Sequence, residues 1–287
     1  MLKKLLALSL LMVGFVVQAQ TYKFAITDLE GMEELEREFG QFKKVLEAKT
    51  GDTIKFFPVP SRTAGVEAMK SKKVDFVLTG PAEYVVFKKK ANAKQVVGFG
   101  RPDYFSVIAV MADSGISSVK DLKGKKVALG SVGSTSKHLT PMQMMADHGL
   151  DPLKDIKAIH TNYKIQWESL KRGDVAAIGI TNSKFVKFRS KEKELQPAAF
   201  KVIARSMDLP NDVLLAGEHI SDDVIKKYKD AFVKNQKELS DAILTGEDNK
   251  KYKGMKFIAN VKDSDYNYVR SMYKTIGYPE FSSFVGD

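Results

Sequence analysis

The chain has 287 residues, no cysteine and a formal net charge of +11 at pH 7. Without cysteine it has no disulfide bonds and no thiol for a lipid anchor. Its basic residues are scattered and often alternate with acids, as in 189–194, which is typical of a solvated face rather than a nucleic-acid surface. A positive surplus of this kind still favours the approach of small anions.

The amino terminus predicts export. Lys3 and Lys4 precede an apolar run over 5–17, which is too short to cross a bilayer comfortably. Small residues follow at signal-peptidase spacing, so we expect residues 1–19 to be removed after Ala19. An amino-terminal membrane anchor is the alternative. No later stretch approaches 18 apolar residues, so we expect a soluble periplasmic protein.

Short hydrophobic runs then alternate with helical stretches. The first helix, 32–48, places apolar residues at helical spacing and ends before Gly51. Helices are also predicted over 63–71, 137–148, 222–244 and 264–275. Strands are predicted over 22–27, 54–59, 74–78, 106–111, 126–129, 156–160, 176–180, 202–204 and 213–216. This alternation predicts an α/β fold with mainly parallel sheets, and the segments 104–112 and 200–205 are candidate crossings between lobes.

The strongest local motif is the segment 130–136, Gly-Ser-Val-Gly-Ser-Thr-Ser, which lies between a predicted strand and a predicted helix. A glycine-rich turn at a helix start exposes backbone N–H groups, and three hydroxyls can add donors, so the motif suits an anion. An ordinary helix cap is the alternative. The segment lacks the Gly-Lys-Ser/Thr of a nucleotide P-loop.

A second strand-to-helix turn follows 74–78. Pro81 suits the first position of a helix, and Tyr84 lies within that helix's first turns. Tyr84 could present its hydroxyl to a ligand or pack in the core.

Enzymatic motifs are absent from the sequence. The four histidines show no metal-ligand spacing, and no Gly-x-Ser-x-Gly elbow exists. We therefore expect no catalytic residue, no metal and no cofactor.

Several of these segments, in this order, are also found together in one protein family. They are 22–27, 74–76 leading to Gly80-Pro81-Ala82-Glu83-Tyr84, 121–125, Gly133-Ser134-Thr135-Ser136 with Pro141, and 173–177. On these the chain resembles the phosphonate/phosphite/phosphate-type periplasmic substrate-binding proteins of ABC transporters, over nearly its whole length after residue 19.

The resemblance implies a type II periplasmic binding protein fold, with two strands as a hinge. One lobe would hold 20–111 and 206–287, and the other 112–205. The ligand would lie between them, held by Tyr84, Ser134, Thr135 and Ser136.

Three further family positions depart from the usual pattern. A ligand-facing tyrosine is replaced by Arg62, a histidine by Tyr163, and an acidic residue by Asn182. All three are candidate ligand contacts. Loss of a proton acceptor and gain of an arginine predict a preference for a fully deprotonated or more highly charged oxyanion. Alternatively, Arg62 points to solvent and other contacts keep the usual ligand.

The resemblance implies a monomer that captures a small oxyanion and docks on an ABC transporter permease. A sensing role beside a membrane histidine kinase would use the same cleft, and an exported enzyme is a third possibility. Nucleic acid is not an expected partner.

Overall fold

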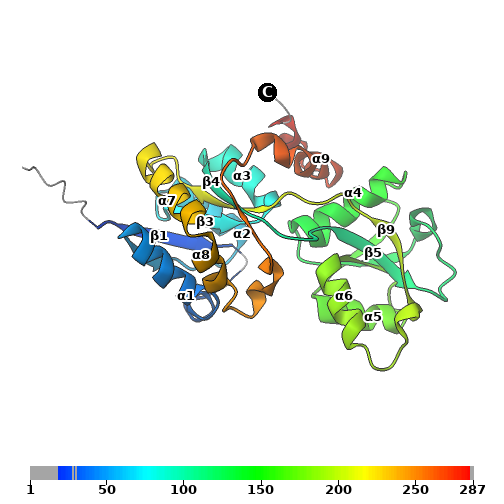
Figure 1. Cartoon of the computed structure of the whole chain (residues 1–287). Helices are drawn as coiled ribbons and strands as arrows, with labels where there is room; N and C mark the ends of the chain where they lie inside the picture. The colour runs from blue at the N-terminus through cyan, green and yellow to red at the C-terminus, as the bar shows by residue number, and fades with distance from the viewer. Residues whose placement is uncertain (1–18, 28, 30, 285–287) are drawn as a thin grey trace, which may run out of the picture.

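In the computed structural model of the protein, the described residues are 19–27, 29 and 31–284, and they form two lobes, each built on its own sheet (Figure 1). The predicted two-lobed α/β architecture is confirmed. The predicted signal peptide lies outside the described residues except for Ala19. Within the described part of the chain, no helix has the length and apolar character needed to span a membrane.

The first lobe has a six-stranded mixed sheet in the order β11-β4-β10-β3-β1-β2. Its strands are β1 (Thr21–Ile26), β2 (Thr53–Phe56), β3 (Phe76–Thr79), β4 (Lys94–Phe99), β10 (Asp212–Ala216) and β11 (Phe257–Ile258). β1 runs parallel to β2 and β3, whereas β10 runs antiparallel to β3 and β4. One face is covered by α1 (Met32–Thr50), α7 (Asp222–Lys234) and α8 (Gln236–Ile243), and the other by α2 (Arg62–Lys70) and α3 (Pro81–Ala91).

The second lobe has a five-stranded mixed sheet in the order β7-β6-β8-β5-β9. Its strands are β5 (Ser106–Met111), β6 (Lys126–Leu129), β7 (Lys157–His160), β8 (Ala177–Thr181) and β9 (Phe200–Arg205), and its helices are α4 (Thr140–Asp147), α5 (Tyr163–Lys171) and α6 (Asn182–Lys191). β6 is parallel to β7 and β8, while β5 is antiparallel to β8 and β9. The sheets are therefore mixed, because the strands next to the crossings run against their neighbours.

The first crossing lies earlier than the sequence suggested. β5 was predicted to end the first lobe, but it pairs with β8 on one side and β9 on the other. Five of its six residues are buried, so it needs a neighbour on each side and finds both in the second sheet. The boundary therefore moves from 111 to about 105, and the first crossing segment is 100–105. The predicted second crossing, 200–205, forms β9 of the second sheet, so the second crossing segment is 206–211.

Helix α1 shows how the apolar pattern sets the fold. Leu35, Phe39, Phe42 and Leu46 recur at three- and four-residue intervals and are all buried against the first sheet. The helix ends where Gly51 adopts φ 73°, a left-handed conformation that favours glycine. The buried face of this helix and the residue at which it ends therefore follow directly from the sequence.

Helix α9 (Asn267–Thr275) ties the two lobes together at the hinge, where Figure 1 shows it lying between them. It contacts α3 of the first lobe and α4 of the second. The Tyr273 hydroxyl donates to the Ala82 carbonyl at 2.9 Å, and the Thr275 hydroxyl donates to Gln143 Oε1 at 2.6 Å. The carboxyl-terminal segment therefore belongs to the hinge as well as to the first lobe.

Candidate functional site

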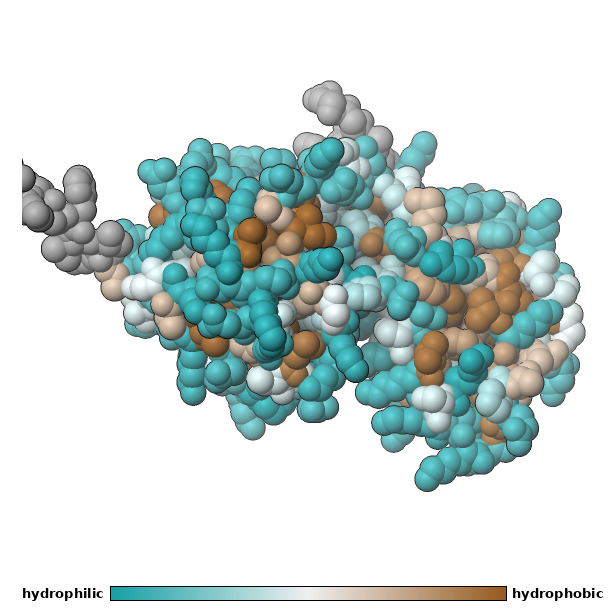
Figure 2. All heavy atoms as spheres, viewed as in Figure 1, coloured by the Kyte–Doolittle hydropathy of each residue, from teal (hydrophilic) through white to brown (hydrophobic). Residues whose placement is uncertain are grey.

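A cleft of about 430 Å³ lies between the two lobes. Figure 2 shows hydrophilic residues along both sides of the hollow that separates them. The cleft is lined by seven basic side chains (Arg62, Arg101, Lys137, Lys184, Lys187, Lys250 and Lys251) and five acidic ones (Glu34, Glu83, Asp212, Glu247 and Asp248). The basic excess favours an anionic occupant.

Ser134, Thr135 and Ser136 line this cleft from the second lobe. They follow β6 at the start of a π-helical turn, η2 (Thr135–Leu139), which leads into α4. Each is at most 5% exposed. The side-chain hydroxyls of Ser134 and Ser136 make no hydrogen bond to any part of the protein that the structure describes. Two nearly buried hydroxyls are thus left for a ligand.

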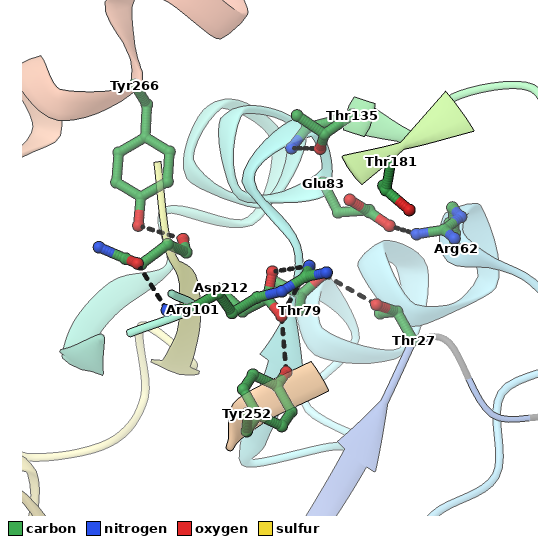
Figure 3. A network of polar contacts seen from close by, with 12 residues as sticks. Thr27, Arg62, Thr79, Glu83, Arg101, Thr135, Thr181, Asp212, Tyr252 and Tyr266 are labelled. Carbon is green, nitrogen blue, oxygen red and sulfur yellow. Dashed lines mark hydrogen bonds and ion pairs between the residues drawn. The ribbon is translucent and has the colours of Figure 1, made fainter. Parts of the chain in front are cut away.

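Thr135 connects the two lobes. The backbone N–H of Ala82, in the first turn of α3, donates to Thr135 Oγ1 at 2.9 Å (Figure 3). Both groups are buried, and Gly80 before the helix also lines the cleft. The start of α3 and the turn therefore face each other, so the first lobe adds the positive end of a helix to the hydroxyls of the second.

Two histidines brace the turn from behind. The Gly133 N–H donates to His138 Nδ1 at 3.1 Å, and His160 Nδ1–H donates to the Gly130 carbonyl at 2.7 Å. The two rings lie edge to face with centroids 4.7 Å apart. Burial, and secondarily the neighbouring His160, lower the pKa of His138 to about 4. His138 is therefore neutral near pH 7, which leaves Nδ1 free to accept.

Arg62 lines the cleft at the start of α2, and its guanidinium forms an ion pair with the Glu83 carboxylate (Figure 3). Glu83 is 4% exposed and also lines the cleft. The positive charge of Arg62 is thus compensated within the first lobe. This weakens the argument that an unpaired Arg62 guanidinium binds two oxygens of the ligand.

Tyr163 lines the cleft from the start of α5, and its hydroxyl lies 3.0 Å from Thr181 Oγ1. The ammonium groups of Lys137 and Lys184 lie 5.2 and 5.8 Å from the centre of its ring. Tyr163 therefore holds two cleft cations by cation–π attraction.

Comparisons with known proteins agree with this geometry. A family model described as "ABC transporter, phosphonate, periplasmic substrate-binding protein" matches residues 24–266. The chain belongs to this family.

Three relatives illustrate the likeness. The phosphate-import protein PhnD of Mycolicibacterium smegmatis is 26% identical over 75% of this chain and 72% of its own. The phosphonates-binding periplasmic protein of Escherichia coli is 26% identical over 75% of this chain and 66% of its own length. PhnD1 from Prochlorococcus marinus, solved with methylphosphonate, superimposes with a TM-score of 0.68 at 17% identity, covering 90% and 98% of the two chains. These are type II periplasmic binding proteins, and the fold is the one expected.

Two residues carried over from the family pattern lie off the cleft wall. Tyr84 is fully buried, stacks near Tyr266 with ring centroids 4.2 Å apart, and donates its hydroxyl to Asp263 Oδ1 at 2.5 Å. Burial and the Asp263 carboxylate raise the pKa of Tyr84, which keeps it a donor. Asn182 begins α6 and is half-buried, but its neighbours Thr181 and Ser183 line the cleft. A ligand contact by either side chain stays a prediction.

The sequence missed a polar network on the wall of the first lobe. Arg101 Nη1 lies 3.3 Å from Asp212 Oδ1, and the Tyr252 hydroxyl donates to Asp212 Oδ2 at 2.6 Å (Figure 3). The guanidinium carbon of Arg101 also lies 3.6 Å from the centre of the Tyr104 ring. Arg101 lies within the first crossing segment, and Asp212 directly follows the second. A charged residue at each crossing is the sequence feature that could have indicated this network.

No group of three His, Cys, Asp or Glu side chains is arranged to hold a metal ion within the described part of the chain. The cleft offers hydrogen-bond donors and positive charge, and these are the groups that bind an oxyanion.

Proposed function

We propose that the protein captures a small phosphonate or phosphate oxyanion in the interlobe cleft and presents it to the permease of an ABC transporter. The observation that carries the proposal is the pair of nearly buried Ser134 and Ser136 hydroxyls, which face the cleft without a partner in the described protein. Neither hydroxyl oxygen is among the fully enclosed polar atoms of the described protein, so each can be reached from the cleft and can donate to a phosphonate oxygen there.

The relatives support this ligand class. The names of the two similar proteins specify phosphate and phosphonates, and PhnD1 was solved with methylphosphonate. The start of α3 lies opposite the turn, so a ligand between them would contact both lobes and stabilise the closed form.

We further propose that the protein acts as a periplasmic monomer whose first residue is Gln20. Mass spectrometry of the exported protein reports its first residue, and sedimentation reports its mass. An intact Met1 in the membrane fraction would contradict the processing.

The ligand proposal is tested by calorimetric titration with methylphosphonate, phosphate, phosphite and sulfate. Ser136→Ala removes one hydrogen bond to a charged group, about 1.5–3 kcal/mol, so affinity should fall roughly ten- to a hundredfold. Ser131→Ala is the matched control, because Ser131 lies in the same loop but is exposed. Equal affinity in the Ser136 variant and wild type, or no binding of any of the four anions, would refute the proposal.

A further inference from the structure

A second group of cations lines the cleft apart from the Ser134–Ser136 turn. Lys184 and Lys187 project from the first turns of α6, where Ser183 also lines the cleft. Lys251 lines the same cleft from η4 (Asp248–Tyr252), a helical turn that is part of the first lobe's chain. These three lysines come from both lobes, and we refer to them as the lysine cluster.

Lys184 is the informative member of the lysine cluster. It is half-buried, and it makes no hydrogen bond or ion pair with any residue the structure describes; its ammonium group lies 5.8 Å from the centre of the Tyr163 ring. Burial and the charges of Lys187, Lys251 and Arg101 lower its pKa, while Asp248 acts in the opposite sense. A half-buried cation among like charges is unfavourable, and a bound anion would remove that cost.

The cleft is also large for the smallest ligands. Water occupies roughly 30 Å³ per molecule, so 430 Å³ has room for about 14 water-sized groups. Methylphosphonate has five non-hydrogen atoms. A ligand whose oxyanion sits at the turn can therefore extend further along the cleft.

The five acidic lining residues all belong to the first lobe, where Glu247 pairs with Lys250 and two others meet arginines. Glu83 pairs with Arg62, and Asp212 is held by Arg101 and the Tyr252 hydroxyl. These two carboxylates are committed within the first lobe. The uncompensated positive charge accordingly lies on the α6 side.

We propose that the cleft contains a second anionic subsite, formed by Lys184, Lys187 and Lys251, and that the physiological ligand carries a second anionic group, a carboxylate or a further phosphate, beyond its phosphonate or phosphate. This rests on the proposed function for the first anionic group. One end of the ligand binds the turn, and the other end binds the lysine cluster. Because the cluster draws on both lobes, the second group also favours closure.

The experiment compares diacids with their neutral isosteres. Wild-type protein is titrated with phosphonoacetate, 3-phosphonopropionate and 4-phosphonobutyrate, each beside its carboxamide, and with pyrophosphate beside phosphate. We expect at least one diacid to bind at least tenfold more tightly than its carboxamide, or pyrophosphate than phosphate, since a charged hydrogen bond is added. The chain length that shows the largest ratio measures the spacing, and the pyrophosphate arm distinguishes phosphate from carboxylate as the second group.

Variants locate the effect. Lys184→Gln should reduce the acid-to-amide ratio to near one and lower diacid affinity far more than methylphosphonate affinity, whereas Lys184→Arg, which keeps the charge, should retain the ratio. Lys191→Gln, an exposed lysine at the other end of α6, is the matched control and should change neither. Ratios near one for every pair in wild type, or an equal loss for methylphosphonate and diacids in Lys184→Gln, would overturn the second subsite while leaving the proposed function intact. Failure of wild type to bind methylphosphonate, phosphate and every diacid would overturn both.

Discussion

Protonation of His138 should both destabilise the second lobe and loosen the anion-binding turn. The pKa of His138 in the folded protein is about 4, against about 6.5 for an unperturbed histidine. Its Nδ1 accepts the Gly133 N–H, and a protonated ring cannot accept there. Acid therefore acts on one group that supports both folding and the geometry of the turn.

The size and direction of the effect follow from the pKa difference. Between about pH 6.5 and pH 4 the unfolded chain binds a proton that the folded His138 does not, so stability falls as pH falls. The contribution is complete above pH 6.5. Each unit of pKa difference corresponds to about 1.36 kcal/mol in the free energy of unfolding. The whole loss of stability is therefore about 3 kcal/mol, of which about 2 kcal/mol is lost by pH 5.

The assay is urea unfolding from about pH 7.5 to about pH 5, followed by fluorescence of Trp167, the single tryptophan, which is buried in the second lobe. The test variant is His138→Asn, whose Oδ1 can accept from Gly133 without titrating. Between about pH 7.5 and about pH 5 its free energy of unfolding should fall by about 2 kcal/mol less than that of the wild-type protein. His148→Gln, on an exposed histidine after α4, should keep the wild-type profile.

Binding gives a second readout on the same proteins. Methylphosphonate affinity should fall more steeply with acid in wild type than in His138→Asn, because the ligand's own protonation is common to both. Identical stability profiles for wild type and His138→Asn would refute the assignment of the low pKa. Identical affinity profiles would separate His138 from the turn.

Three further substitutions distinguish packing from binding. Tyr84→Phe removes a buried hydroxyl that donates to Asp263, so stability should fall by about 1–2 kcal/mol with methylphosphonate affinity unchanged; a large affinity loss would instead place the hydroxyl at the ligand. Asp212→Asn breaks a buried ion pair with Arg101 and should cost about 3 kcal/mol in urea unfolding, and an unchanged midpoint would contradict this. Gly179→Ala places a Cβ 2.6 Å from ring carbons of Pro141 and should lower the melting temperature through about 1–3 kcal/mol of overpacking, and an unchanged melting temperature would contradict this.

The sequence predicted the fold well wherever local patterns decide the structure. Helix α1 and the turn at Ser134–Ser136 depend on short-range spacing, on Gly51 and on hydroxyls at a helix start. Strand β5 could not be assigned in this way. A buried strand reads the same in either sheet, because its lobe is chosen by pairing with β8 and β9, which lie far along the chain.

The orientation of Tyr84 shows a second limit. Helix α3 is buried around most of its circumference, with Ala82, Tyr84, Val85 and Phe87 all enclosed. A helix without one solvent-facing side gives no periodic signal for the direction of each side chain. The family pattern therefore suggested a role for Tyr84 that periodicity had no means to check.

The charged residues of the cleft show a third limit, since Lys184 and Lys251 are separated by 66 residues and each sits in a run that looks solvated. Their proximity exists only once the lobes face each other. The same holds for Arg62, which the sequence offered as a free positive fork and which the structure pairs with Glu83.

Because of these pairings, the two lobes contribute different kinds of groups to the cleft. On the first lobe, Glu83 and Asp212 each meet an arginine, so that wall is close to neutral and offers the start of α3 as a dipole. On the second lobe, hydroxyls and the lysines of α6 face the cleft with no carboxylate in contact with Lys184 among the described residues. An anion can therefore bind first to the open second lobe, whose cleft lining carries lysines and no carboxylate among the described residues, and the first lobe can then close over it. The order follows from where the uncompensated charge lies, since long-range attraction acts before short-range hydrogen bonds can form.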